Sequence, residues 1–187
     1  MSFPDPERVR ADTLDWLDKA VIGLNLCPFA KSVRVKGQVR TLVSTATDTD
    51  ALLAELVAEL RHLAEVDPQT TDTTLLVHPR VLTDFLDFND FLDVAEMALR
   101  QEGLEGTLQI ASFHPQFQFA GTDADALSNF TNRSPWPTLH LIREASIDRA
   151  VQAFPEAEAI FERNIEVLEQ LGLAGWQRLF DDPKATR

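Results

Sequence analysis

Hydrophobic residues recur along the chain at two spacings, and these spacings predict alternating helices and strands. Intervals of three and four residues mark one face of a helix, whereas alternation or a short apolar run marks a strand. The clearest helix is capped by Asp48 or Thr49 and carries one apolar stripe, formed by Leu52, Leu53, Leu56, Val57, Leu60 and Leu63. The other expected helices cover residues 6–22, 88–101, 146–154 and 155–172, and the expected strands cover residues 38–44, 73–78, 107–113 and 138–143.

The order of these elements predicts an α/β domain, bordering on α+β, with a four-stranded mixed sheet flanked by helices. Two strand–helix–strand units imply parallel pairs. The fourth strand has no helix before it, so we expect it to return antiparallel beside the third. The connection 114–137 is long, aromatic and without periodic pattern, and we expect it to pack over the sheet edge as a lid or pocket wall. Residues 1–187 should form a single domain.

Three histidines are predicted to meet at one edge of this sheet. His78 and His114 each precede a proline at the end of a strand, and His140 lies near the start of the fourth strand. Ligands bind at such an edge in open α/β sheets. Three imidazoles are sufficient to hold a catalytic zinc or iron ion, although their spacing matches no known metal motif. The alternatives are a metal-free site that uses one or two of them, and structural histidines bonded to loop backbone.

Composition narrows the class of protein. The chain is 44% hydrophobic and 25% charged, as expected of a globular domain, and its net charge of −13 argues against nucleic acid or an anionic membrane as partner. We find no membrane span and no signal peptide, and the single cysteine cannot form an internal disulfide, so we expect a soluble, cytoplasmic protein. With seven glycines and no phosphate-binding loop, the sequence identifies no cofactor.

Two stretches of the chain carry a family resemblance. They are GLNLCPFAKSVRVKGQVR at residues 23–40, and SFHPQFQFAG with NRSPWPTLHLIREA within residues 112–145. The chain resembles an uncharacterised bacterial and plant family that is catalogued as a domain of unknown function, number fourteen-fifteen, and the resemblance covers nearly its whole length. It implies a compact cytosolic or organellar domain, but it carries no activity, cofactor or substrate.

Basic residues are segregated from acidic ones. The window 19–47 contains five basic residues and no acidic residue. A small positive zone in an acidic protein favours a small anionic ligand, a carboxylate or phosphate, which arginine binds with two parallel hydrogen bonds. Alternatively, these charges pair with the acidic helices. The candidate ligand-binding residues are Lys31, Arg34, Arg133, Trp136 and Arg143.

Cys27 is a candidate nucleophile because Lys31 and Arg34 follow it closely, and nearby cations lower the pKa of a thiol. However, it follows the C-terminus of a helix, where the dipole has the opposite effect, and its apolar neighbours favour a buried structural role.

The leading hypothesis is an enzyme that acts on a small anionic metabolite. Arg143 and Arg133 would hold the anion, His114 or His140 would move a proton, and Cys27 would be the nucleophile if the fold brings it to the same edge. The sequence leaves open whether the protein is an enzyme at all. The alternative is a non-catalytic module that senses an anion or binds a protein through the same pocket.

Overall fold

The structure is a computed structural model, and it describes residues 4–153 and 159–181. The helices are α1 (Pro6–Trp16), the π-helix η1 (Leu17–Ile22), α2 (Ala30–Val35), α3 (Thr49–Glu65), α4 (Phe85–Gln101), the 3₁₀-helix η2 (Leu127–Asn132), α5 (Glu144–Ala153) and α6 (Ile160–Phe180). The strands are β1 (Val39–Val43), β2 (Thr73–Val77), β3 (Leu108–Phe113) and β4 (Thr138–Arg143).

The four strands form one mixed sheet in the order β1-β2-β4-β3, which confirms the predicted fold class. β1 and β2 are parallel neighbours, and β4 runs antiparallel to both β2 and β3. The antiparallel pairing of β3 with β4 agrees with the prediction. The expected parallel pairing of β2 with β3 is wrong. β4 lies between these two strands and forms hydrogen bonds with both.

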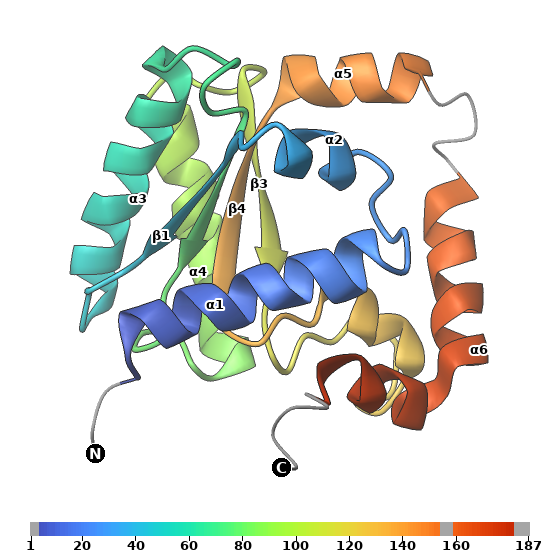
Figure 1. The fold of residues 1–187 in the computed structure, drawn as a ribbon. Coiled ribbons are helices and arrows are strands. Elements are labelled where there is room, and N and C mark those ends of the chain that lie inside the picture. The colour runs from blue at the N-terminus through green and yellow to red at the C-terminus, as the bar shows by residue number, and fades with distance from the viewer. Residues whose placement is uncertain (1–3, 154–158, 182–187) are drawn as a thin grey trace.

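Helices cover both faces of the sheet, with α1 crossing one face while α3 and α4 lie on the other (Figure 1). Because side chains alternate along a strand, the two faces carry different residues. On what we call the α1 face, Leu75 and Val77 pack with Val9 and Trp16. On the α4 face, the buried strand residues Leu76, Leu139 and Leu141 pack against the apolar stripe of α3 and against α4.

Several helix boundaries differ from those expected. α4 begins three residues earlier because Asp84 caps it and accepts hydrogen bonds from the backbone N–H groups of Leu86 and Asp87 at 2.8 and 3.3 Å. α5 begins directly after β4 rather than at Ser146.

Gly172 does not end the last helix; with φ of +67° it bends α6, which continues to Phe180. The expected boundaries at Phe154 and Pro155 lie outside the described residues.

The long connection after β3 is ordered and contains η2, which the sequence did not reveal. Asn129 holds it together: its side-chain oxygen accepts the backbone N–H of Phe119 at 2.9 Å, and its side-chain nitrogen donates to the carbonyl of Asp123 at 2.9 Å. Phe117 packs on Phe85 of α4, with ring centroids 5.3 Å apart. The expected packing of this segment over the sheet edge is therefore observed.

Candidate functional site

Two of the three histidines meet at the sheet edge where β2 and β3 end. His78 and His114 both face α4, and both stack on the ring of Phe88, with centroid distances of 5.5 and 5.2 Å and interplanar angles of 28° and 29°. Each follows the last residue of its strand, so strand alternation turns both side chains to the same face. Both side chains have 0% exposure to solvent.

The hydrogen bonds of these two histidines define their tautomers and hold the loop between β2 and α4. His78 Nδ1 lies 2.8 Å from the carbonyl oxygen of Val81, which only accepts, so Nδ1 carries the proton. His114 Nδ1 accepts the backbone N–H of Gln116 at 3.0 Å, so its Nε2 donates to the carbonyl of Leu82 at 3.3 Å. Leu82 has φ of +57°, a strained conformation for leucine, and the two imidazoles stabilise it.

Burial leaves the imidazoles of His78 and His114 uncharged and closed to solvent. Desolvation lowers the pKa of His78 to about 4 and also lowers the pKa of His114, so that both rings are neutral at physiological pH. His78 Nε2 is buried without a hydrogen-bond partner. The catalytic role predicted for His114 is not supported, because its ring is sealed from solvent and both of its nitrogens bond to backbone.

His140 lies on the α1 face, opposite Leu75 and Ala111 in the sheet register. Thr73 lies on the same face, and its hydroxyl donates to the carbonyl of Leu141 at 2.7 Å. The same hydroxyl oxygen therefore accepts from His140 Nε2 at 2.6 Å, which leaves Nδ1 as an unprotonated acceptor. The side chain is half-buried, and desolvation lowers its pKa to about 4.

The predicted three-histidine metal site does not form. His140 is separated from His78 and His114 by the sheet itself, because it projects from the opposite face. Throughout the described residues, no group of three or more His, Cys, Asp or Glu side chains is placed to hold a metal ion.

Cys27 packs against the apolar cluster of the α1 face, as does Ala30 at the start of α2. The same cluster contains Leu75, the strand neighbour of His140. Desolvation is the largest influence on the thiol and raises its pKa, although hydrogen bonds from the backbone of Phe29 and Ala30 oppose this. Cys27 is therefore a thiol at neutral pH, and the predicted activation by neighbouring cations is not observed.

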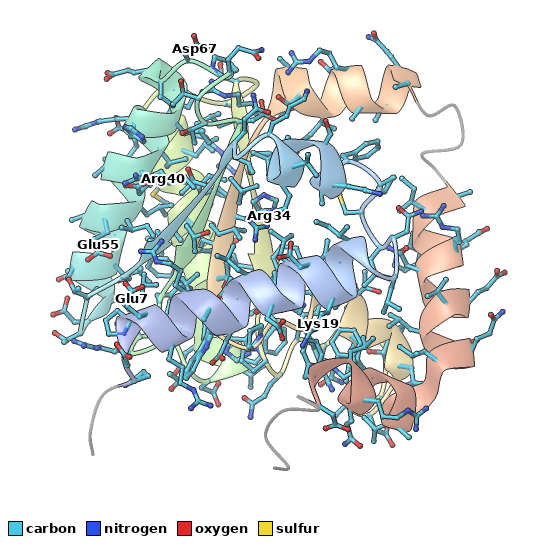
Figure 2. All side chains as sticks on the ribbon, viewed as in Figure 1. Glu7, Lys19, Arg34, Arg40, Glu55 and Asp67 are labelled. Carbon is cyan, nitrogen blue, oxygen red and sulfur yellow. The ribbon has the colours of Figure 1, made fainter. Side chains whose placement is uncertain are left out.

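Arg34 extends from α2 towards α1, in front of the sheet (Figure 2), and reaches Asp18. Its Nε and one terminal nitrogen donate to the two carboxylate oxygens of Asp18, both at 2.9 Å. Asp18 belongs to the π-helix η1, and π-turns occur often at functional sites. Lys31 is exposed on the same short helix as Arg34. Asp18 and Thr73 have no recognisable signal in the sequence, because only the fold brings each to its partner.

Trp136 also packs against the α1-face cluster, and its indole N–H donates to a carboxylate oxygen of Asp12 at 3.3 Å. Five of the predicted site residues are therefore associated with the α1 face or with the short helix that packs on it: Cys27, Lys31, Arg34, Trp136 and His140.

The two arginines expected to hold an anion have other roles. Arg143 ends β4, at the edge opposite to the His-Pro ends, and donates to the carbonyls of Val66 and Thr71 at 2.7 and 3.2 Å. Desolvation lowers its pKa, and its Nε has no partner.

Arg133 braces the 114–137 connection. It donates to the carbonyls of Phe117 and Ala124 at 3.1 and 2.5 Å and lies 4.5 Å from the ring centroid of Phe130. Arg133 follows Asn132, whose carbonyl accepts the backbone N–H of His114 at 3.2 Å, whereas Arg143 lies at the opposite end of β4. The two arginines therefore do not converge on one position.

The fold is that of an α/β protein, and five of its candidate residues are associated with the α1 face of a mixed sheet. The chain belongs to the family described as protein of unknown function (DUF1415), whose model matches residues 8–178. This confirms the resemblance noted in the sequence. No curated protein and no solved structure matches the chain. Among the described residues, no helix has both the length and the apolar character needed to cross a bilayer.

Proposed function

We propose that the α1 face binds a small anionic metabolite, a carboxylate or phosphate, between α2 and η1. The observation that carries this proposal is the pair of parallel hydrogen bonds, each 2.9 Å long, that Arg34 donates to the Asp18 carboxylate. A ligand carboxylate or phosphate presents the same two acceptors and is able to replace Asp18. The ion pair is partly exposed, with 34% of Arg34 and 47% of Asp18 accessible, so the exchange needs no rearrangement of the core.

The charge around α2 supports an anion over a cation. Residues 19–47 contain no acidic residue, and Lys31 and Lys36 are both exposed beside Arg34. Three of the five basic residues in this window pair with carboxylates: Lys19 with Asp15, Arg34 with Asp18, and Arg40 with Glu59. The positive charge that favours an anion is therefore mainly that of Lys31 and Lys36, in a chain whose net charge of −13 repels polyanions.

We further propose that the protein is an enzyme in which His140 accepts a proton from the bound metabolite. Thr73 fixes the tautomer, so Nδ1 offers its lone pair to the ligand. A pKa of about 4 makes His140 a weak base in the free protein. An anion bound nearby raises the pKa of the imidazole, because it stabilises the charged form, and brings it closer to the working range of a general base.

The alternative is a non-catalytic module that senses the anion or binds a protein partner. His140→Gln distinguishes the two, because glutamine retains a donor for Thr73 but cannot accept a proton. An enzyme would lose turnover and keep its affinity for the ligand. A binding module would show a change of affinity only.

The anion site is tested by thermal unfolding in sodium pyrophosphate and in citrate, against sodium chloride at matched ionic strength. A ligand present at about 100 times its dissociation constant stabilises the protein by about 2.7 kcal/mol, which corresponds to roughly 5–10 °C for a chain of this size. Arg34→Gln should abolish this shift. Arg40→Gln is the matched control: Arg40 makes the same two-bond pair, with Glu59 of α3 at 2.7 and 3.0 Å. An equal loss in both variants, or no shift in the wild type, contradicts the proposal.

A further inference from the structure

A groove of about 480 Å³ lies between α3 and α4, beside the N-terminus of each helix. These helices cover the face of the sheet opposite to α1 (Figure 1), so the groove is separate from the proposed anion site. Its apolar lining comes from Leu53 of α3, Leu82 of the β2–α4 loop, and Phe91 and Val94 of α4. This volume is sufficient to accept one or two large apolar side chains.

Three carboxylates line the same groove: Asp50 of α3, and Asp87 and Asp90 of α4. Within the part of the chain that the structure describes, none of them forms an ion pair. The helix dipoles account for Asp50 and Asp87, which lie in the first turns of their helices. They do not account for Asp90, which lies in the second turn. The groove therefore combines an apolar floor with three carboxylates, of which Asp90 has neither an ion pair among the described residues nor a place in the first turn of its helix.

The outer surface of α4 extends this apolar character. Leu86, Val94 and Met97 are 70%, 40% and 54% exposed. At 100° per residue these three positions and Asp90 lie on one side of the helix, in a stripe about 16 Å long. An exposed apolar stripe that continues a groove is typical of a protein-binding surface.

We propose that this groove docks a basic amphipathic helix from a partner protein. Apolar side chains of that helix would enter the groove and cover the α4 stripe, while its lysines or arginines would pair with Asp50, Asp87 and Asp90. Charge complementarity identifies this occupant: a second copy of this chain, with its net charge of −13, is repelled, and a small anion is excluded by the three carboxylates. A stripe of about three helical turns matches the helix-in-groove mode of recognition.

The test uses a fluorescein-labelled synthetic helix of leucine and lysine, with leucine at every third and fourth position, and fluorescence anisotropy in low salt. The groove variant combines Asp50→Asn, Asp87→Asn and Asp90→Asn. The matched control combines Glu162→Gln, Glu166→Gln and Glu169→Gln, which removes three exposed carboxylates from α6 and gives the same net charge. We expect the groove variant to bind about tenfold more weakly and the α6 variant to change by less than about twofold. Circular dichroism establishes that both variants remain folded.

The apolar contribution is tested separately. Val94→Ser should weaken binding several-fold, whereas Val35→Ser, at a position 78% exposed on α2, should not. A peptide of the same composition with its leucines scrambled should bind worse than the amphipathic one. Equal weakening in the groove and α6 variants would overturn the proposal. Equal binding of the scrambled peptide would also overturn it and indicate a site for any organic cation. Self-association that the groove variant abolishes would indicate a second copy as the occupant.

Discussion

Acidification should destabilise the fold through its buried histidines, and His78 provides the sharpest test. Burial lowers its pKa to about 4, whereas an imidazole in the unfolded chain titrates near 6.5. As the pH falls below 6.5 the unfolded chain takes up a proton and the folded chain does not. The contribution of His78 to the unfolding free energy is therefore fully present above pH 6.5, and it is lost progressively as the pH falls to 4.

The expected loss follows from the difference of about 2.5 pKa units. At about pH 5 it amounts to about 2 kcal/mol, and below pH 4 it reaches about 3 kcal/mol. His140, whose pKa burial also lowers to about 4, should contribute a similar loss. Together they would remove about 4 kcal/mol at pH 5, a large fraction of the 5–15 kcal/mol that stabilises a typical domain.

The assay is urea unfolding followed by tryptophan fluorescence, at about pH 7.5 and about pH 5, for the wild type and for His78→Gln. The difference in unfolding free energy between the two pH values should be about 2 kcal/mol smaller in the variant. Each protein is compared with itself at the two pH values. The free energy that the variant loses with the hydrogen bond to Val81 therefore cancels from the difference. His62→Gln, at an exposed position of α3, is the control and should change the difference little. If His78→Gln has the same pH dependence as the wild type, the reasoning is refuted.

Three further predictions follow from local geometry. Asp84→Ala removes the cap of α4 and should lower the unfolding free energy by about 1 kcal/mol in urea titrations, and no change would mean that the cap is dispensable. Cys27 should react with iodoacetamide at neutral pH more slowly than a free cysteine, because burial raises the pKa of its thiol; faster reaction would restore the nucleophile hypothesis. Arg143→Met leaves the carbonyls of Val66 and Thr71 without their donor and should cost about 2–4 kcal/mol in the same titrations, whereas a negligible loss would show that water replaces the guanidinium.

Most of the fold could be predicted because its signals are local. The stripe of α3 and the apolar runs of the strands are intervals of a few residues, and each predicted strand lies within one residue of the observed one at both ends. The position of β4 was not predictable in the same way. The pairing of β4 with β2 depends on contacts between residues more than 60 positions apart, such as Leu75 with His140.

The candidate site was predicted only in part, because strand register determines which face a side chain occupies. His78 and His114 were correctly placed at the same edge, since each follows the end of a strand. His140 projects to the other face because β4 pairs it with Leu75, and a shift of one residue would have turned it towards α4.

Arg143 illustrates a different error, because its true position could have been deduced. An antiparallel strand that starts at the ligand edge ends at the opposite one, and five steps along β4 from Thr138 cover about 16 Å.

The most direct test of the account is an NMR titration of the imidazole nitrogens with sodium pyrophosphate. We predict that the His140 resonances move in the direction of protonation as the anion binds, while those of His78 and His114 stay unchanged. Arg34→Gln should remove the His140 response and Arg40→Gln should preserve it. Movement of the His78 or His114 resonances with His140 unchanged would place the ligand on the opposite face of the sheet and contradict the account.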